Sequence, residues 1–295
     1  MTRHFLTGEE LTSDELASLL DRALELKADR RASRALAGRS VALVFERPST
    51  RTRVSFEVGV AELGGHAIVL RPDELQLARG ESVRDTALVL SRFVAAVAVR
   101  TGPHHVVEEL AADASVPVIN MLTREHHPCQ VLADLLTLRE RFGRLEGLKL
   151  AYVGDGNNVT RSLMLLGEKA GLELAVASPA QLALAGAASG ASMTDDPAEA
   201  VDGAHAIYTD VWVSMGDDGG DADERRALLR PSQLNADLLG AARADAVALH
   251  CLPAHPGEEI TADVLYGERS AVWDQAENRL HAQKALMELL IAGRG

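Results

Sequence analysis

The sequence predicts an α/β protein with two doubly wound parallel-sheet domains and a C-terminal closing helix. Short apolar runs alternate along the chain with longer amphipathic segments. The runs are nearly continuous and do not alternate apolar with polar residues, which is typical of strands covered on both faces by helices. The pattern restarts after Gly143 and Gly147, and 295 residues are enough for two separate cores.

The first domain is expected to span residues 1–135. It opens with a helix from Ser13 to about Lys27, in which apolar residues recur at helical spacing. Its apolar, β-branched runs end in Gly, Pro or polar turns, as strands do. We predict its strands at residues 40–45, 66–70, 95–100 and 116–121. We predict its further helices at residues 52–63, 82–93, 106–114 and 129–142.

The second domain is expected to span residues 136–275. We predict its strands at residues 149–153, 173–177, 204–208, 246–250 and 271–273. A helix over residues 278–291 closes the chain, and the segment 276–295 is expected to pack back on the first domain. The acidic stretch 217–224 is interpreted as a solvated loop, with a lid as the alternative because it follows Ser214-Met215-Gly216.

Composition and charge narrow the class of protein. Acidic residues outnumber basic ones by 43 to 30, so the formal net charge is −13. Such a surface repels nucleic acid and anionic membrane, which both require a positive footprint, and we expect neither as a partner. No apolar run approaches the ~20 residues that span a bilayer, and no apolar signal segment follows Met1. Two cysteines do not make a disulfide framework, so we expect a cytoplasmic protein that acts on small molecules.

The first segment with chemical content follows the first predicted strand and begins a helix. It reads Phe45-Glu46-Arg47-Pro48-Ser49-Thr50-Arg51-Thr52-Arg53. Pro48 and Ser49 or Thr50 suit the first turn and the cap of that helix. A helix start offers unpaired N–H groups and partial positive charge, and three arginines with three hydroxyls make it an oxyanion site of the phosphate type. The alternative is a capped helix with solvated arginines, and a glycine-rich Walker pattern is absent.

The second segment is His126-His127-Pro128-Cys129-Gln130, which begins the long helix after the fourth predicted strand. His127 and Gln130 are three residues apart and can face one crevice. A histidine donor could polarise a carbonyl, and the Gln amide could accept from an NH2 group. A metal site is the weaker interpretation, because His126, His127 and Cys129 lack a complementary pair at liganding spacing.

The third segment, Gly154-Asp155-Gly156-Asn157-Asn158, is a turn between a strand and a helix in the second domain. A dinucleotide-binding fingerprint would require a third glycine where Val159 stands and an acidic residue where Ser178 stands. We therefore do not expect a nicotinamide or flavin cofactor. The turn better suits polar contacts, with Asn158 as a candidate for holding a carboxylate or an ammonium group.

Two further segments also end predicted strands. Asp210, which begins Asp210-Val211-Trp212-Val213-Ser214-Met215-Gly216, could balance a cationic substrate or could simply be a capping or surface residue. In His250-Cys251-Leu252-Pro253-Ala254-His255, Cys251 invites a nucleophile interpretation with a histidine base. Adjacent residues of an extended chain point to opposite faces, so His250 cannot easily activate Cys251. A thiol placed beside reacting amines is the favoured interpretation, ahead of a buried structural cysteine.

Together these segments resemble the aspartate and ornithine carbamoyltransferase family, over essentially the whole chain. The stretch Ser49–Arg53 is similar to the carbamoyl-phosphate signature, and His127-Pro128-Cys129-Gln130 to the second signature. The segments from Asp210 to Gly216 and from His250 to Pro253 resemble the ornithine branch of the family, and Asp274–Arg279 extends the match near the end. The alanine-rich region around residues 182–197 matches least well.

The resemblance implies a role for each matching residue. Ser49, Thr50, Arg51, Thr52 and Arg100 are expected to bind the phosphate of carbamoyl phosphate. Thr52, His127 and Arg279 are expected to surround the carbonyl oxygen, while Gln130 and the backbone at Cys251 and Leu252 receive the NH2 group. Asn158, Asp210, Ser214 and Met215 are expected to hold ornithine, with Cys251 beside its reacting amine. Gln76 is expected to enter the site of a neighbouring subunit.

The resemblance also implies a reaction and an assembly. The carbamoyl group passes to the δ-amine of L-ornithine, giving L-citrulline and phosphate, in arginine biosynthesis or, in reverse, in arginine breakdown. No cofactor or metal is expected, because carbamoyl phosphate is already activated by its leaving group, and the family forms homotrimers or multiples of them. The alternatives are a carbamoyltransferase for another amine and a non-catalytic binder of carbamoyl phosphate, which would be expected to lack Arg51, His127 or Arg279.

Overall fold

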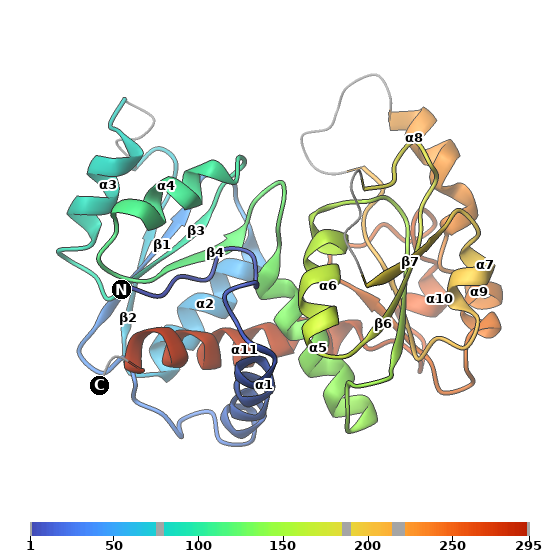
Figure 1. Ribbon diagram of the computed structural model, residues 1–295, viewed down its shortest axis with the longest axis horizontal. Coiled ribbons are helices and arrows are strands. Elements are labelled where there is room, and N and C mark those ends of the chain that lie inside the picture. The colour runs from blue at the N-terminus through green and yellow to red at the C-terminus, as the bar shows by residue number, and fades with distance from the viewer. Residues whose placement is uncertain (1, 75–79, 185–189, 214–221, 294–295) are drawn as a thin grey trace. The chain divides into compact units, whose positions relative to one another are not determined.

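The computed structural model describes residues 2–74, 80–184, 190–213 and 222–293 (Figure 1). The chain divides into two compact units. Unit 1 comprises Met1–Leu136 together with Glu277–Gly295, and unit 2 comprises Thr137–Ala276. Each unit contains a parallel β-sheet with helices on both faces, as the sequence predicts.

The sheet of unit 1 is parallel throughout, in the order β2-β1-β3-β4. Its strands are β1 (Ser40–Phe45), β2 (His66–Leu70), β3 (Ala96–Arg100) and β4 (Val118–Leu122). The interior strands β1 and β3 are almost entirely buried, which explains why their sequences are continuous apolar runs. Phe45 lies opposite Arg100 in the register, so the segments that follow β1 and β3 leave the sheet side by side.

Helices cover both faces of this sheet. They are α1 (Ser13–Ala28), α2 (Thr50–Glu62), α3 (Val83–Leu90), α4 (His105–Asp113), the first part of α5 (Pro128–Phe142) and most of α11 (Val272–Ala292). In Figure 1, α3 and α4 lie over one face, and α2 and α11 lie over the other. An apolar core lies between the sheet and the helices α3 and α4, and in it Val44 and Val99 of the strands pack with Ala87 of α3 and Leu110 of α4.

The sheet of unit 2 has the order β7-β6-β5-β8-β9 and is also parallel. Its strands are β5 (Lys149–Val153), β6 (Glu173–Ala177), β7 (Ala191–Thr194), β8 (Ala206–Thr209) and β9 (Val247–His250). Its helices are α6 (Asn158–Lys169), α7 (Pro197–Val201), α8 (Ala222–Leu229), the 3-10 helix η2 (Arg230–Ser232), α9 (Ala236–Ala241) and α10 (Ala262–Leu265). One apolar core joins Val153 and Ile207 of the sheet to Val201 of α7, Leu239 of α9 and Val264 of α10.

Gly156 allows two segments of unit 2 to meet closely after β5. Its N–H donates to the Leu182 carbonyl at 2.7 Å. A Cβ at this position would lie 2.4 Å from the backbone nitrogen of Leu184, a distance that real Cβ atoms do not show. Because that neighbour is backbone and not a flexible side chain, position 156 requires glycine.

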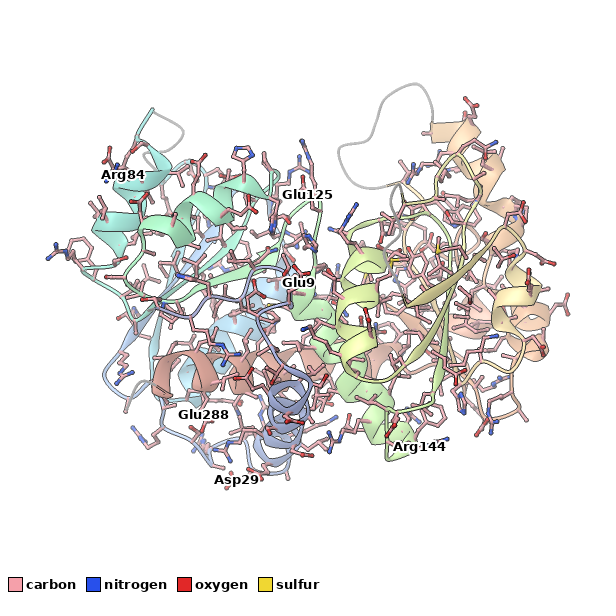
Figure 2. All side chains as sticks on the ribbon, viewed as in Figure 1. Glu9, Asp29, Arg84, Glu125, Arg144 and Glu288 are labelled. Atoms are coloured by element: carbon pink, nitrogen blue, oxygen red, sulfur yellow. The ribbon has the colours of Figure 1, made fainter. Side chains whose placement is uncertain are left out.

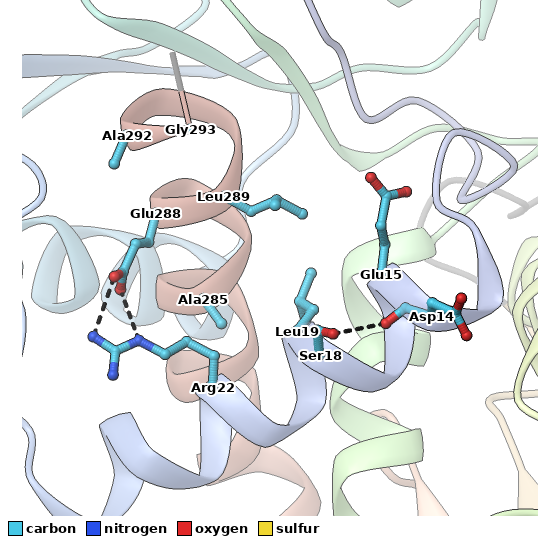
Figure 3. Close-up of a pocket in the computed structure, with 10 residues that line it drawn as sticks. All are labelled: Asp14, Glu15, Ser18, Leu19, Arg22, Ala285, Glu288, Leu289, Ala292 and Gly293. Atoms are coloured by element: carbon cyan, nitrogen blue, oxygen red, sulfur yellow. Dashed lines mark hydrogen bonds and ion pairs between the residues drawn. The ribbon is translucent and has the colours of Figure 1, made fainter. Parts of the chain in front are cut away.

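Helix α11 carries several buried polar side chains, Arg279 and Lys284 among them, and is hydrogen-bonded to α1 within unit 1. Arg22 of α1 donates to both carboxylate oxygens of Glu288, at 3.2 and 3.1 Å. These two residues lie on one side of a hollow of about 440 Å³ between α1 and α11, whose apolar floor includes Leu19, Ala285 and Leu289 (Figure 3). None of the residues singled out from the sequence lines this hollow.

Two sequence predictions about elements are wrong in part. Residues 271–273 are not a strand, because α11 begins at Val272 and Ala271 only donates a backbone hydrogen bond to the Ala248 carbonyl. A three-residue apolar run is too short to show the periodicity that distinguishes a strand from a helix. The acidic stretch 217–224 is not all loop, because its last three residues form the first turn of α8, where Asp223 and Glu224 complement the helix dipole. Residues 217–221 lie outside the described residues.

The short edge strand β7 was missed by the sequence prediction. It lies in the alanine-rich region and reads Ala-Ser-Met-Thr, and none of its four residues is buried. The burial that makes an apolar run recognisable is therefore missing.

Charged side chains lie mainly on the outside of each unit. Glu9, Asp29, Arg84 and Arg144 are exposed and labelled in Figure 2. Among the described residues, no helix is both long enough and apolar enough to span a bilayer.

Candidate active site

The residues singled out from the sequence gather, within each unit, at the carboxyl edge of the sheet. In unit 1 they follow β1, β3 and β4, and in unit 2 they follow β5, β8 and β9. Carboxyl ends of parallel strands share one edge, and this edge is where ligands bind in open α/β sheets. We describe the two groups separately as cluster 1, in unit 1, and cluster 2, in unit 2.

Cluster 1 begins with the start of α2. Ser49 is its cap and accepts a hydrogen bond from the Thr52 N–H at 3.4 Å. Thr52 is fully buried in the first turn, whereas Thr50 is exposed and Arg51 is partly exposed. No acidic residue occupies this first turn, so the positive end of the helix dipole is not neutralised locally. The helix start therefore keeps the character of an anion site.

Arg279 of α11 joins the two signature segments. Its guanidinium donates to Thr52 Oγ1 at 2.6 Å and to Gln130 Oε1 at 3.0 Å. Gln130 in turn donates from Nε2 to Asp134 Oδ1 at 2.8 Å. Arg279 is only 3 % exposed, and Thr52 and Gln130 are fully buried. A planar guanidinium with five donors can make these contacts and still present donors to a ligand.

His127 lies in the same cationic surroundings. Burial lowers its pKa well below the ordinary value of 6.5, and the nearby Arg279 and Arg100 lower it further. The ring is therefore neutral at physiological pH and carries one N–H donor. It is held after β4 by a tight turn, in which the Thr123 N–H donates to the His126 carbonyl at 2.9 Å.

Cys129 is a buried cysteine in the first turn of α5. Its thiol is fully buried and donates to the Asn120 carbonyl at 3.3 Å. Burial raises its pKa to about 12, although Arg279 lowers it, so the thiol is protonated at physiological pH.

Asp210 is the centre of cluster 2. Its Oδ1 accepts from the Cys251 thiol at 2.9 Å and from the Val211 N–H at 2.8 Å. Its Oδ2 accepts from Asn157 Nδ2 at 2.9 Å. The side chains come from the ends of β5, β8 and β9, and Asp210 is 8 % exposed.

A second buried carboxylate, Asp155, lies beside Asp210. Burial raises its pKa to about 6, the Arg225 guanidinium lowers it, and the charge of Asp210 raises it again. Arg225 of α8 forms an ion pair with Asp155 and also donates to the Trp212 carbonyl. Two buried carboxylates therefore share this edge of the sheet with one described guanidinium, which favours an additional cation.

The segment after β9 is fixed by His250. The Leu252 N–H donates to His250 Nδ1 at 2.8 Å, and His250 Nε2 lies 3.1 Å from Glu259 Oε1. Both ring nitrogens are thus engaged away from the Cys251 thiol, which agrees with the expectation that His250 does not activate it. Although ligand atoms of Asp210, His250 and Cys251 lie within 4.8 Å of one another, His250 is already committed to these contacts.

Leu252 adopts a left-handed backbone conformation with a φ of 60°, and the peptide bond to Pro253 is cis. A leucine in this region is rare and persists only where its surroundings hold it. The hydrogen bond to His250 is one such restraint.

The structure brings most of the predicted site residues into the two clusters, but not all. Asn158 is the first residue of α6, and its neighbour Asn157 donates to Asp210 Oδ2 at 2.9 Å. Gln76, Ser214 and Met215 lie outside the described residues.

Sequence reasoning missed Asp155, Asn157, Arg225 and Glu259. Asn157 had a recognisable signal, since an asparagine directly before an apolar helix is typical of a cap, and it does cap α6. Arg225 had none, because it pairs with a residue 70 positions away.

Comparison with known proteins matches both units. Residues 3–140 match the family described as aspartate/ornithine carbamoyltransferase, carbamoyl-P binding domain. Residues 146–290 match its Asp/Orn binding domain. A curated ornithine carbamoyltransferase from Acidothermus cellulolyticus is 53% identical over 308 residues, covering 100% of this chain and 98% of the relative.

Solved structures are similar over the same length. The ornithine carbamoyltransferase from Pyrococcus furiosus has a TM-score of 0.94 and 47% sequence identity, covering 99% of this chain and 98% of that chain. The enzyme of that name from Thermus thermophilus has a TM-score of 0.92 and 44% identity, covering 99% of both chains.

Proposed function

This chain belongs to the aspartate/ornithine carbamoyltransferase family, and we propose that it transfers the carbamoyl group of carbamoyl phosphate to the δ-amine of L-ornithine, giving L-citrulline and phosphate. The observation that carries the proposal is that the two clusters have opposite charge: cluster 1 is positive and cluster 2 is negative. Arg279 with Thr52 and Gln130 suits an activated carbonyl compound, and Asp210 with Cys251 and Asn157 suits a cationic amino acid.

In cluster 1, we assign Ser49, Thr50, Arg51 and Thr52 to the phosphate group, together with Arg100. The arrangement combines a helix start with arginines, which supplies both directional N–H donors and net positive charge. Local positive charge is needed because the chain as a whole carries a formal charge of −13.

We assign Thr52, His127 and Arg279 to the carbonyl oxygen of the carbamoyl group, and Gln130 to its NH2. As the amine attacks, negative charge develops on that oxygen, and donors already aimed at it stabilise the transition state. The lowered pKa of His127 suits this role, since a neutral ring donates a hydrogen bond without giving up a proton.

In cluster 2, we assign Asp210 and Asn158 to ornithine, and we place Cys251 and the backbone of Leu252 beside the reacting nitrogens. Asp210 supports this assignment because it is nearly buried and lies in contact with the Cys251 thiol. Ser214 and Met215 keep their predicted role in holding ornithine, although they lie outside the described residues.

The reaction is an attack by the neutral amine on the carbonyl carbon, followed by loss of phosphate. An amine with a lysine-like pKa of ~10.4 is neutral in only about one molecule in a few thousand at pH 7. We therefore expect the rate to rise with pH until the bound amine or a site group has lost its proton. A flat profile from about pH 6 to 9, with the chemical step shown to limit the rate, would contradict this mechanism. We name no side chain as the sole general base.

We also propose that the chain works as a cytoplasmic homotrimer or a multiple of trimers, in arginine metabolism. Four large apolar side chains of unit 1, Val54, Leu88, Val89 and Phe93, are exposed, which supports a further protein contact there. Both cysteines are free thiols, which fits a reducing compartment. Gln76 keeps its predicted role in a neighbouring subunit's site. Sedimentation analysis measures the assembly directly.

The test of the proposed reaction is product formation from carbamoyl phosphate with ornithine, aspartate, putrescine and N-acetylornithine side by side. We expect citrulline from ornithine and no comparable product from the other three. Activity with another amine would keep the roles of cluster 1 and overturn those of Asp210, Ser214 and Met215. No product from any of the four would favour a non-catalytic binder of carbamoyl phosphate.

A further inference from the structure

Lys284 is a fully buried cation outside both clusters. Its ammonium donates to the Arg30 carbonyl at 2.7 Å, to Glu62 Oε2 at 2.8 Å and, more weakly, to the Leu26 carbonyl at 3.5 Å. Its side chain has no exposed surface. Three acceptors match the three donors of an ammonium, so this charge is buried without an unsatisfied N–H.

The acceptors around Lys284 come from the ends of two other helices. Leu26 belongs to the last turn of α1, Arg30 follows that helix, and Glu62 is the last residue of α2. A cation at a helix C-terminus is favoured by the partial negative charge of the free carbonyls there. One side chain of α11 therefore ties α11 to the ends of α1 and α2.

Glu62 is ionised in this arrangement. Burial alone would raise its pKa, but hydrogen bonds from Arg30 and Lys284 bring the pKa below its ordinary value. Arg30 Nε donates to the other oxygen, Oε1, at 2.7 Å. Glu62 would consequently keep one cationic partner if the Lys284 ammonium were removed.

Gly59 lets α11 come close to α2 at this point. A Cβ on Gly59 would lie 3.2 Å from Lys284 Cγ, 3.4 Å from Leu280 Cδ1 and 3.4 Å from Met287 Cε. The aliphatic stem of Lys284 thus packs directly on the backbone of α2, in a space that a larger residue would narrow.

The same two helices also meet at the other end of α2, in cluster 1. Arg279 donates to Thr52 at 2.6 Å, and Lys284 donates to Glu62 at 2.8 Å. Thr52 and Glu62 are ten residues apart, about 15 Å along α2, and the two donors are five residues apart, about 7.5 Å along α11. Two contacts spaced along both axes fix the position of one helix on the other, which one contact alone cannot do.

We propose that Lys284 is a positioning residue for the carbamoyl-transfer reaction, which sets the place of Arg279 by holding α11 on the ends of α1 and α2. The inference rests on the proposed function for its catalytic readout. Among the described residues, Lys284 contacts none that is assigned to substrate, so its effect on the reaction must pass through α11 to the Arg279 guanidinium. A displacement of about 1 Å in a catalytic group can cost on the order of 10²-fold in rate.

The experiment compares Lys284→Met with Arg22→Met. Both substitutions replace a cation with an unbranched apolar side chain, and both cations hold α11 to another helix of unit 1. Arg22, however, binds Glu288, which lies nine residues beyond Arg279. With ornithine saturating, we expect Lys284→Met to lower kcat/KM for carbamoyl phosphate on the order of tenfold, mainly through kcat. We expect Arg22→Met to change it less than twofold. Equal losses in the two variants would overturn the inference.

A double-mutant cycle separates positioning from stability. Arg279→Met alone should lower kcat/KM far more, and adding Lys284→Met to it should lower the rate less than twofold further, because Arg279 is then no longer there to be positioned. The decreases in Tm should instead add. Losses in kcat/KM that multiply in the double variant would show that Lys284 acts independently of Arg279, and would overturn the inference.

The two proposals can fail separately. A wild-type protein that makes no citrulline would overturn the proposed function. The inference would then be judged by calorimetric titration with carbamoyl phosphate itself. Lys284→Met, but not Arg22→Met, should weaken that binding about threefold or more, and equal binding by both variants would overturn it.

Discussion

Cluster 1 and cluster 2 are built on the same kind of sheet edge but have opposite charge. Cluster 1 contains Arg100 and Arg279 around a neutral histidine, with a helix start that no acidic residue neutralises. Cluster 2 contains Asp155 and Asp210, both nearly buried, with Arg225 as a single described counter-charge. Parallel-strand ends thus provide the location in each unit, and the side chains alone decide whether it accepts an anion or a cation.

The two clusters also differ in how far apart in the sequence their contacting residues lie. In cluster 1 the contact of Arg279 with Thr52 spans 227 positions. In cluster 2 the contacts of Asp210 with Asn157 and Cys251 span 53 and 41 positions. Cluster 1 therefore depends on the packing of α11, whereas cluster 2 depends mainly on one sheet edge. Four predictions test this contrast.

The largest effect is expected from Arg279→Met, which removes the donor to both Thr52 and Gln130. We expect kcat/KM for carbamoyl phosphate to fall on the order of 10²–10³, as for loss of a group that stabilises an oxyanion. Initial rates of citrulline formation at saturating ornithine measure it, with Arg22→Met as the control for a charge lost elsewhere in unit 1. A loss below tenfold would mean that cluster 1 does not centre on Arg279.

The next effect is expected from Asp210→Asn, which keeps the shape of the side chain and removes its charge. The KM for ornithine should rise on the order of 10², because a nearly buried charge partner is lost, while the KM for carbamoyl phosphate changes less than twofold. Asp237→Asn, an acidic position in α9 outside cluster 2, is the matched control. If both KM values rose together, the division of substrates between the clusters would be wrong.

A smaller effect concerns the pH dependence of stability in cluster 2. The pKa of Asp155 in the folded chain is about 6, above its ordinary value of 3.8. The folded state therefore holds a proton that the unfolded state releases, and this stabilisation is lost as the pH rises from about 4 through about 6. Between pH 5 and 7 the loss amounts to about 1 kcal/mol.

Asp155→Asn should remove this pH-dependent component. Chemical denaturation at pH 5, 6 and 7 gives the free energy of unfolding of the wild type and of the variant. The difference between the two should decrease as the pH rises. Thr52→Val in cluster 1 is the comparison, since it removes no titratable group. A constant difference between wild type and Asp155→Asn would indicate that Asp155 is ionised throughout this range.

Much of the fold could be predicted because a buried strand is recognisable in the sequence as a short apolar run. The runs that became β1, β2, β5 and β6 were predicted with their observed bounds, since each is short, apolar and followed by a turn. The edge strand β7 is not an apolar run and was therefore missed. Ala271-Val272-Trp273 is an apolar run but is too short to distinguish a strand from a helix, and it was wrongly predicted as a strand.

For the site, the residues that lie in recognisable segments were predicted, whereas some of their long-range partners were not. The segments Ser49–Thr52 and His127–Gln130 are recognisable because helix starts and strand ends have local rules. That Arg225 reaches Asp155, or that Glu259 lies against His250, depends on how distant segments pack, and no local pattern encodes it. The same holds for Lys284, which looks like any helical lysine until its burial is known.

The smallest effect is expected from Ser49→Ala, which tests whether a helix cap in cluster 1 also binds ligand. Its hydrogen bond to the Thr52 N–H is long, so the cost in stability should be about 0.5 kcal/mol, at the low end for a lost cap. If its hydroxyl also donates to phosphate, the KM for carbamoyl phosphate should rise about fivefold, equivalent to about 1 kcal/mol. Thr12→Ala is the matched control, because Thr12 caps α1 of the same unit through the Glu15 N–H at 3.2 Å and belongs to neither cluster. A similar loss of stability in both variants, with the KM raised only in Ser49→Ala, would separate binding from capping, whereas an unchanged KM would leave Ser49 with the cap alone.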